Sequence, residues 1–382
     1  MISTHSLIGA CGYLCLILAA CYSLLTLIAA TVWRHRFIPV PSSQPQPATV
    51  LKPLCNDEPH LYEHLRTFCQ QDFTTFQLVF GVRDLADPAL RAVRRLVAEF
   101  PHLQIDVVVD PVLHGRNYKI SNLINMVRHA RYDVLVLADS DTWVGPEYLA
   151  SVTAPLHNPA VSLVTCIYRD VPTARISSRL GAMYVNEWYM PCVLLAQLFG
   201  FRGYVSGQTL CLRRATLEAI GGFKAIANHL ADDHRLGELV RASGLKIVMS
   251  SYLVAAQHDE VNLASLFRHE LRWMRTLRVL RPRSFPWLFL SFSLLLASGG
   301  LLCLAKPAVP LGAGVLFWIT VVARLLLHFM QRAPAERPLL GDLWLLPVRE
   351  LLIFAVWCRG FFPSRVLWRG HAFDVGSDGI MR

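Results

Sequence analysis

The sequence contains no CxxC pair and no cluster of cysteine with histidine, although it has ten cysteines. A structural zinc site needs such spacing, so none is predicted. Several of the cysteines lie in apolar runs and the others share no regular spacing. We therefore interpret them as small buried hydrophobic residues of a protein in a reducing compartment.

Charged residues are also scarce, at 17% of the chain, whereas hydrophobic residues make up 54% and the mean hydropathy is +0.39. This balance excludes both an ordinary soluble domain and a bundle built only of membrane helices, and it fits one soluble domain with a few membrane segments. The formal net charge of +10 favours an anionic membrane surface or a phosphate-bearing ligand as partner. The polar part has no basic run interleaved with aromatic residues, which argues against nucleic acid.

A long run without charged residues lies near the start of the sequence, from Ser6 to Trp33. It exceeds the roughly 20 apolar residues that span a bilayer core, and it lacks the basic start of a cleaved signal peptide. We therefore predict a membrane anchor over residues 1–33. Arg34 and Arg36 follow the run, which predicts an outer N-terminus and a cytoplasmic domain by the positive-inside tendency.

Further apolar runs lie near the other end of the sequence. Residues 343–362 include Arg349 and Glu350, which are costly at mid-bilayer, so an interfacial or re-entrant segment is expected there rather than a full third C-terminal span. The predicted parts after the anchor are a linker (34–48), a polar domain (49–283), a transmembrane helical hairpin turning at Lys306-Pro307 (284–331), this segment (343–362) and a tail (363–382).

The polar domain alternates short β-branched runs with helical patterns. Strands are predicted at residues 49–51, 77–82, 105–109, 133–137 and 161–167. Asp87-Pro88 is typical of a helix start, with the proline at the first helical position, and an apolar stripe follows at Leu90, Val93, Leu96 and Val97. The alternation predicts an α/β fold, a mostly parallel sheet with helices on both faces, which binds ligands at the carboxyl ends of its strands.

Asp139-Ser140-Asp141 directly follows a run that is typical of a buried parallel strand. Two carboxylates at this place could share a divalent cation that also takes diphosphate oxygens. The alternative is a polar turn with a helix cap. The position after an apolar strand favours the cation site, held by Asp139 and Asp141.

Two further polar residues follow the expected strands. Asp84 has no evident capping role, so it is a candidate for binding a nucleoside base or ribose. Lys119 stands at the start of a predicted helix, where a cation opposes the helix dipole. This placement indicates an anionic ligand, and the alternative is a solvated lysine.

Candidate groups for the chemical step come later in the chain. Asp232-Asp233 offers a carboxylate that could act as general base toward an acceptor hydroxyl, although a helix N-cap is the alternative. Arg272-Trp273 lies in an arginine-rich stretch beside a membrane segment, where most arginines are expected to contact lipid phosphates. This pair differs, because a cation beside a large aromatic side chain could bind a diphosphate and shape an acceptor pocket.

Taken in order along the chain, these motifs resemble those of the ceramide glucosyltransferase family of nucleotide-sugar glycosyltransferases. No single motif carries the resemblance. The ordered set does, and it comprises Val50-Leu51-Lys52-Pro53-Leu54, Leu61-Tyr62-Glu63, Gln71-Asp72, Asp84 to Pro88, the group Gly115, Asn117, Lys119 and Asn122, then Asp139-Ser140, Ser206-Gly207, Gly221-Gly222-Phe223, Asp232-Asp233 and Arg272-Trp273.

The resemblance implies a GT-A fold, an inverting reaction and a UDP-sugar donor. It implies that Asp84 and Lys119 bind the donor, that Asp139 and Asp141 hold Mg²⁺ or Mn²⁺ with the diphosphate, and that Asp233 is the base. Arg272 and Trp273 would serve the diphosphate or the acceptor. His269 stands where the family has Gln or Arg, which leaves the role of this side chain open and argues against a processive synthase.

The chain also resembles the bacterial branch of the family that accompanies hopanoid biosynthesis, in length and in the stretch Trp368-Arg369-Gly370. This resemblance implies UDP-N-acetylglucosamine as donor, bacteriohopanetetrol as acceptor and a multi-pass protein of the bacterial inner membrane. The alternatives are a glycolipid synthase of the ceramide type that uses UDP-glucose, and a processive β-glycan synthase, which usually has more membrane helices. A catalytically silent scaffold is a further alternative, but its acidic motifs would have decayed.

Overall fold

The computed structural model describes residues 4–35, 46–304, 309–331, 339–362, 366–368, 371–373, 376 and 378–382. Most of the predicted linker and the Lys306-Pro307 turn lie outside these ranges. The described residues form two units, which we call the helical unit and the sheet unit. The helical unit comprises Met1–Arg36, Ala174–Gly200 and Glu260–Ser364, and the sheet unit comprises Phe37–Thr173, Phe201–Asp259 and Arg365–Arg382.

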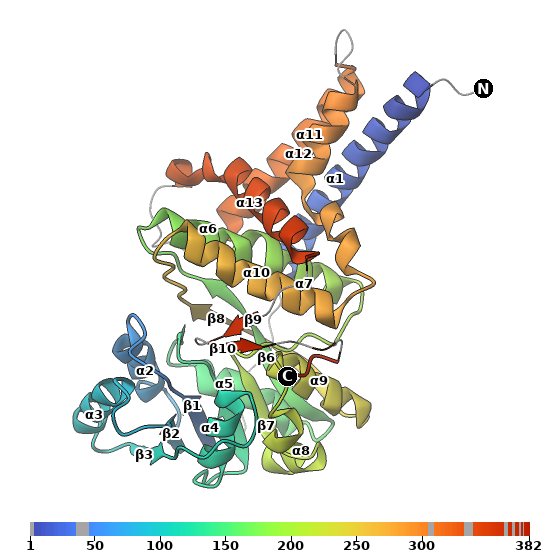
Figure 1. Cartoon of the computed structure of the whole chain (residues 1–382). Helices are drawn as coiled ribbons and strands as arrows, with labels where there is room; N and C mark the ends of the chain where they lie inside the picture. The colour runs from blue at the N-terminus through green and yellow to red at the C-terminus, as the bar shows by residue number, and fades with distance from the viewer. Residues whose placement is uncertain are drawn as a thin grey trace. The chain divides into compact units, whose positions relative to one another are not determined.

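The sheet unit is built on a mixed sheet (Figure 1), and its strand order is β3-β2-β1-β4-β7-β6-β8-β5. Its strands are β1 (Ala48–Pro53), β2 (Phe76–Val82), β3 (Gln104–Val109), β4 (Val134–Leu137), β5 (Thr142–Trp143), β6 (Val161–Asp170), β7 (Leu210–Arg213) and β8 (Lys246–Ala256). A separate antiparallel pair joins β9 (Val366–Trp368) to β10 (His371–Phe373).

Strand direction places many carboxyl ends along one edge of the sheet. β1 runs parallel to β2 and β4, β2 runs parallel to β3, and β6 runs parallel to β8. β7 lies antiparallel between β4 and β6, so these two strands also share one direction. We call the shared end of β1–β4, β6 and β8 the carboxyl edge. The chain order reverses between β1 and β4, the place where such sheets bind ligands.

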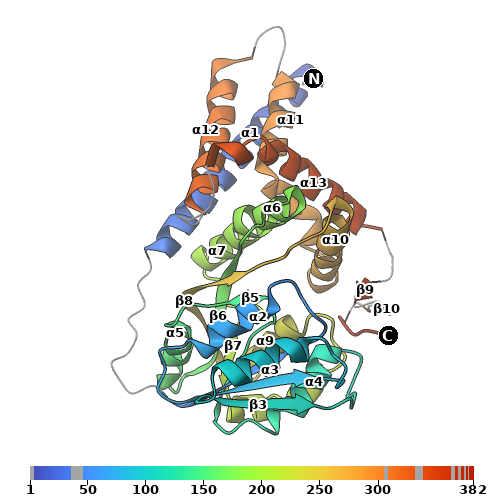
Figure 2. The same ribbon diagram turned by 90° about the vertical axis from the view of Figure 1, so that its left-hand side faces the viewer.

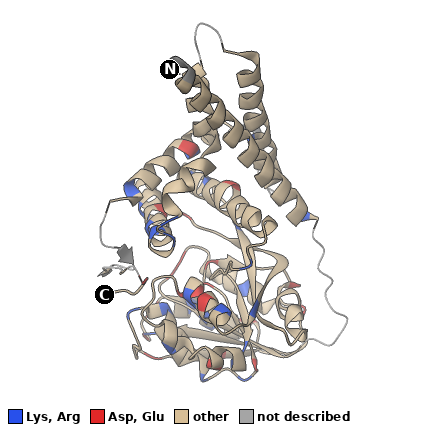
Figure 3. Ribbon diagram, turned by 90° about the vertical axis from the view of Figure 1, so that its right-hand side faces the viewer, with Lys and Arg blue, Asp and Glu red and all other residues tan. Residues whose placement is uncertain are grey.

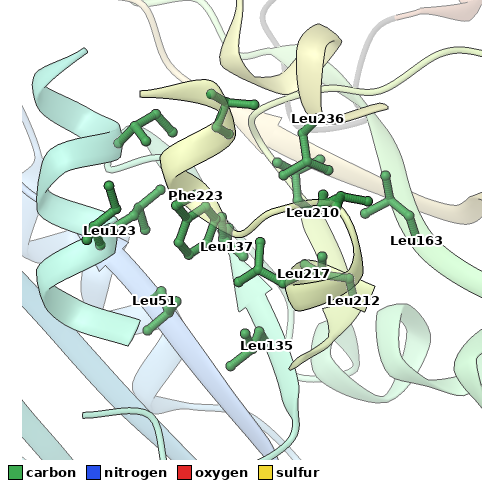
Figure 4. Packing of buried hydrophobic residues seen from close by; sticks show 14 of the residues in the cluster. Leu51, Leu123, Leu135, Leu137, Leu163, Leu210, Leu212, Leu217, Phe223 and Leu236 are labelled. Atoms are coloured by element: carbon green, nitrogen blue, oxygen red, sulfur yellow. The ribbon is translucent and has the colours of Figure 1, made fainter. Parts of the chain in front are cut away.

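Helices cover both faces of the sheet, as predicted. They are α2 (Leu61–Cys69), α3 (Ala89–Glu99), α4 (Tyr118–Val127), α5 (Tyr148–Thr153), α8 (Arg214–Ala219) and α9 (Asp232–Ala242), with short turns η1 (Ala154–His157) and η3 (Phe223–Ile226). Leu123 of α4, Leu217 of α8 and Leu236 of α9 share one apolar cluster with Leu51 and other strand residues (Figure 4). Successive strand residues point to opposite faces. Lys52, next to Leu51, accordingly lies 3.8 Å over the ring of Phe68 from α2.

The predicted strands are all present, with ends that move by a few residues. The predicted start of α3 needs a correction, because Pro88 is the N-cap residue and the Asp87 carboxylate accepts from the Ala89 N–H at 2.9 Å. Val97 is also not in the core, since its side chain is 41% exposed. The buried face of α3 takes in Ala89 and Ala92 and is therefore centred away from Val97.

The helical unit contains the apolar segments. Its elements are α1 (Thr4–Arg34), α6 (Ile176–Tyr184), a π-helical turn η2 (Val185–Tyr189), α7 (Met190–Leu198), α10 (Leu263–Leu280), η4 (Phe285–Ser291), α11 (Ser293–Leu304), α12 (Leu311–Met330), η5 (Leu339–Asp342) and α13 (Leu345–Gly360). Figure 2 shows α1, α11 and α12 side by side, and α1 packs on both partners. Charged residues are sparse along these three helices (Figure 3).

Two of the described helices, over Leu7–Arg34 and Leu311–Met330, are long and apolar enough to cross a membrane. The first arm of the predicted hairpin is not one straight helix, because η4 and α11 meet at an angle of 75°. Phe292 leaves the helical conformation there, and the preceding Ser291 hydroxyl donates to the Leu288 carbonyl while it accepts from the Trp188 indole N–H. Residues 343–362 contain the helix α13, whose relation to a membrane stays a prediction.

Buried ion pairs join the elements of the helical unit. Arg349 of α13 donates to both carboxylate oxygens of Glu270 on α10, at 2.6 and 2.7 Å. Arg324 of α12 lies 3.8 Å from Glu187 on the π-helical turn and 3.5 Å from Glu350. All these side chains are less than a tenth exposed. Since an uncompensated buried charge is costly, the pairs fix how these helices pack on one another.

Candidate functional site

The loop Asp139–Asp141 follows β4 at the carboxyl edge and is held through its backbone. The Asp139 carbonyl accepts from the Lys52 ammonium and from the Thr142 hydroxyl, both at 2.5 Å. The Ser140 hydroxyl donates to Glu58 Oε2, also at 2.5 Å. Because these contacts use the backbone and the serine, they fix the loop and leave both aspartate carboxylates for other partners.

Lys119 joins this loop to a distant part of the chain. It lies in the first turn of α4, whose N-cap Asn117 side chain accepts from the Ile120 N–H at 3.1 Å. Its Nζ lies 2.5 Å from Asp139 Oδ1 and 3.4 Å from Asp232 Oδ2. Burial would lower the pKa of Lys119, but the attraction of Asp139 and Asp232 outweighs it and raises the pKa. Lys119 is therefore a paired cation, and the alternative of a solvated lysine is wrong.

Asp233, which follows Asp232 in the chain, is held by the backbone of Gly207. Its Oδ2 accepts from the Gly207 N–H at 3.0 Å and its Oδ1 from the His234 N–H at 2.6 Å. A Cβ on Gly207 would lie 3.0 Å from Asp139 Oδ2, 3.3 Å from Lys119 Nζ and 3.7 Å from Asp233 Oδ2. The bare backbone of Gly207 thus lies among three of the predicted site residues. Ala231, rather than either aspartate, is the N-cap of α9.

The surroundings of Asp233 suit a general base. Burial and the neighbouring Asp232 raise the pKa of Asp233 to about 6, against the opposing effect of Lys119. A general base works best with a pKa near the operating pH. The carboxylate can therefore take a proton at neutral pH and release it again.

One small hollow connects these groups with the point where the strand order reverses. Pro53 at the end of β1, Lys119, Asp139, Gly207 and Asp232 all line it. β1 and β4 are the two strands on either side of this reversal. Lys119, Asp139 and Asp232, all named from the sequence, therefore meet where an α/β sheet is expected to take its ligand.

Sequence reasoning missed His258 and Asp170, which support Asp141. The His258 ring lies 3.3 Å from Asp141 Oδ2 through Nε2 and 3.3 Å from Asp170 Oδ2 through Nδ1. Burial would raise the pKa of Asp141, but the hydrogen bond and the charge of His258 lower it to about 2. Asp141 is thus held as a carboxylate. Asp170 ends β6, so a polar residue at the end of a predicted parallel strand was the signal that could have found it, whereas His258 follows β8, which was not predicted.

The carboxylates fit a divalent cation of the Mg²⁺ or Mn²⁺ type. Asp141 Oδ1 is buried and has no hydrogen-bond partner among the described residues, as expected for an oxygen that takes a ligand. Within the same described part of the chain, no three His, Cys, Asp or Glu side chains form a ready metal site. Mg²⁺ does not need one, because it is typically held by one or two carboxylates together with substrate phosphates and water.

Asp84 lies at the carboxyl edge after β2, apart from the ion pairs described above. Its side chain is exposed, and its Oδ1 accepts from the Ala86 N–H at 2.9 Å. The carboxylate therefore does stabilise a local turn, a role that was not evident from the sequence. Nucleoside binding by Asp84 stays a prediction.

Arg272 and Trp273 belong to the helical unit, on α10. The Trp273 ring packs against the rings of His269 and Tyr184, with centroid distances of 4.2 and 5.4 Å. His269 in turn lies 2.5 Å from Glu260 through Nδ1. The residue that departs from the family motif therefore orients the tryptophan, and the role of Arg272 and Trp273 toward donor or acceptor stays a prediction.

Comparison with known proteins identifies relatives over most of the chain. Residues 12–381 match the sequence profile described as Glycosyl transferase family 21. The chain is 23% identical to ceramide glucosyltransferase 1 of Caenorhabditis elegans over 344 residues, which cover 87% of this chain and 72% of the relative. It is also 23% identical to ceramide glucosyltransferase 3 of the same organism over 381 residues, covering 97% and 80%.

A solved structure has a similar fold. The mannosyltransferase PcManGT from Pyrobaculum calidifontis, in complex with GDP-Man and Mn²⁺, matches with a TM-score of 0.56 and 18% identity. The match covers 93% of this chain and 99% of that one. At this level of identity the likeness concerns the fold, and it confirms the predicted GT-A type of α/β domain with added apolar helices.

Proposed function

The chain belongs to glycosyl transferase family 21, and from this premise we propose that it moves a sugar from a UDP-sugar onto a hydroxyl of a membrane lipid, with inversion at the anomeric carbon. It is a membrane-associated glycosyltransferase, with two described helices that are long and apolar enough to span a bilayer. One observation carries the finer proposal. Lys119, Asp139 and Asp233, which are far apart in sequence, meet around the backbone of Gly207.

Asp233 is the proposed general base. It takes the proton of the acceptor hydroxyl while that oxygen attacks the anomeric carbon, and the bond from this carbon to the diphosphate breaks. Attack from the face opposite the diphosphate inverts the configuration. The raised pKa of Asp233 supports this role, because its carboxylate then gains a proton near neutral pH.

The leaving UDP carries negative charge, which the proposed donor residues meet. Lys119 is a partly buried cation beside Asp139 and would contact the diphosphate. Asp139 and Asp141 would hold Mg²⁺ or Mn²⁺, and such a cation would neutralise charge on the diphosphate oxygens. Asp84 would bind the nucleoside at the carboxyl edge. Arg272 and Trp273 would serve the diphosphate or the acceptor.

The proposed donor is UDP-N-acetylglucosamine and the proposed acceptor is bacteriohopanetetrol, in line with the resemblance to the hopanoid-associated branch. UDP-glucose with ceramide is the second candidate, and the relatives named ceramide glucosyltransferase favour it. A membrane lipid agrees with the apolar helices α1 and α12. The proposed location is the bacterial inner membrane, with the sheet unit in the cytoplasm, where nucleotide sugars are made.

The test pairs each donor with each acceptor. Purified protein in detergent, supplied with Mg²⁺ or Mn²⁺, is incubated with UDP-N-acetylglucosamine or UDP-glucose and with bacteriohopanetetrol or ceramide. Mass spectrometry should show a lipid that has gained one sugar, and Asp233→Asn should not form it. A polymer of sugars in place of a single addition would favour a processive synthase, and no transfer to any lipid would overturn the proposal.

A further inference from the structure

The last described residues of the chain pair with the loop that precedes the proposed base. The Leu230 N–H donates to the Gly379 carbonyl at 3.1 Å, and the Met381 N–H donates to the Asn228 carbonyl at 2.9 Å. Between these bonds, His229 and Ile380 form an antiparallel bridge. The chain therefore adds a short strand-like contact directly before α9, which begins at Asp232.

The same loop is tied on another side to the start of α4. The Asn117 N–H donates to the Ala227 carbonyl at 2.8 Å, and the Asn117 side-chain amide donates to the His229 carbonyl at 2.9 Å. The Arg116 N–H donates to Asn228 Oδ1 at 2.9 Å. One loop thus connects the helix that carries Lys119 with the helix that carries Asp233, and the C-terminal contact adds two backbone hydrogen bonds to it.

The C-terminal residues form a turn that presents these backbone groups. Gly379 has φ of 76°, a left-handed conformation that a residue with a side chain adopts only with strain. The Gly379 N–H donates to the Gly376 carbonyl at 2.9 Å, and the Ile380 N–H donates to Asp378 Oδ1 at 3.1 Å. Met381 is 1% exposed, so the turn is also anchored by a buried side chain.

We infer that the contact of Gly379 and Met381 with the loop Asn228–Leu230 is a positioning element that sets the place of Asp233. The inference rests on the proposed function, because it needs Asp233 to be the base. Asp233 follows the loop by three residues, and its carboxylate must meet both the Gly207 N–H and an acceptor hydroxyl. Misplacement of a catalytic group by about 1 Å can cost on the order of 10²-fold in rate.

The two proposed cation ligands have supports outside this loop. Asp139 is held by Lys52 and Thr142, and Asp141 by His258. Lys119 is also held by its ion pair with Asp139. Loss of the C-terminal contact should therefore disturb the base more than the groups proposed to bind the diphosphate. Turnover should fall while donor binding stays close to normal.

Met381→Pro tests this inference, because proline removes the N–H that donates to Asn228. Met381→Leu keeps both the N–H and an apolar side chain, and it is the matched control. Arg382→Lys alters an exposed side chain but keeps a cation that can pair with Asp378, and it controls for surface changes. The measurements are kcat, the donor KM, UDP affinity and melting temperature, each in the same detergent.

The expected result is a fall in kcat of about ten-fold or more for Met381→Pro, with donor KM and UDP affinity within about two-fold of wild type. Both controls should keep wild-type kcat. A folded Met381→Pro protein with wild-type kcat would overturn the inference, and so would a loss confined to donor KM. If Met381→Pro does not fold, Gly379→Ala strains the same turn, and wild-type kcat in that variant would overturn the inference equally. Absence of lipid glycosylation by the wild type would instead overturn the proposed function.

Discussion

The Gly207 N–H donates to Asp233 Oδ2 at 3.0 Å. This hydrogen bond places the proposed base near Asp139, which is one of the two proposed cation ligands. Gly207 can come this close because it has no side chain. Its position would put a Cβ within 3.0 Å of Asp139 Oδ2 and 3.3 Å of Lys119 Nζ. The glycine therefore governs the separation of the base from the groups that would hold the diphosphate.

Gly207→Ala should lower donor affinity and turnover together, because the new methyl group presses on both Asp139 and Lys119. We expect a loss of about ten-fold or more in kcat/KM, comparable to one lost charge-assisted contact. Gly312→Ala is the control, since no atom lies within 4 Å of a Cβ at that position. UDP affinity, kcat/KM and melting temperature measure the effect. Normal kinetics in a folded Gly207→Ala protein would contradict the crowding argument.

Asp233→Asn should bind the donor normally and lose about 10²–10⁴-fold in turnover, because a neutral amide cannot accept the hydroxyl proton. Asp232→Asn should be milder, since Asp232 contacts Lys119 at the longer distance of 3.4 Å. Donor affinity, turnover and melting temperature are measured on both variants. The assignment of the base to Asp233 is wrong if Asp233→Asn is folded and turns over within a few-fold of wild type.

The pH dependence of kcat/KM should report the protonation of the Asp233 carboxylate. Burial and Asp232 raise the pKa of Asp233 to about 6, and only the deprotonated form can act as base. Activity should therefore be retained above this pKa and should fall about ten-fold per pH unit below it. The profile of kcat/KM reports groups of the free enzyme. An acidic limb that persists unchanged in the residual activity of Asp233→Asn would show that another group is responsible.

A chelator should abolish activity, and Mg²⁺ or Mn²⁺ should restore it, because Asp139 and Asp141 are proposed to hold the cation. Asp141→Asn should lose donor binding and turnover together. Asp133→Asn is the matched control, because Asp133 directly precedes the same strand and its side chain is 91% exposed. Binding of Mn²⁺ is measured directly by titration in the presence of UDP. Full activity in chelator would exclude the metal role.

Arg349→Met should destabilise the helical unit by about 3–5 kcal/mol, because it leaves the Glu270 carboxylate buried without its partner. Replacing both residues by methionine should recover much of this loss, since no buried charge then remains. The stability of the single and the double variant is measured by melting temperature and by the midpoint of denaturant unfolding. Equal stability of the single and double variants would show that the charges are not coupled.

The sequence predicted the elements whose patterns are local. Each predicted strand is a short β-branched run, and the carboxylates of Asp139 and Asp141 follow one of them, so their place at the carboxyl edge could be inferred. The long apolar helix α1 could be inferred in the same way from its length without charge. Each of these features depends only on residues that are close together in the sequence, so the sequence alone is enough to predict it.

The supporting contacts could not be predicted, because they join residues far apart in the chain. Lys52 lies in a strand and was read only as part of a motif, yet its ammonium holds the Asp139 carbonyl. His258 follows β8, a strand that was not predicted. The bend at Phe292 lies next to Ser291, which accepts from the distant Trp188 indole N–H, and hydropathy does not record such a contact.

The contact between the C-terminal residues and the loop before α9 can form only late in the synthesis of the chain. α1 leaves the ribosome before any strand, and α11, α12 and α13 leave it before Gly379 and Met381. Domains tend to fold as they emerge during translation, at about 5–20 residues per second. The loop Asn228–Leu230 therefore gains its last backbone partners only after the apolar helices are available for membrane insertion. A nascent chain stalled before this point would carry a fully synthesised Asp233 that lacks the contact proposed to position it.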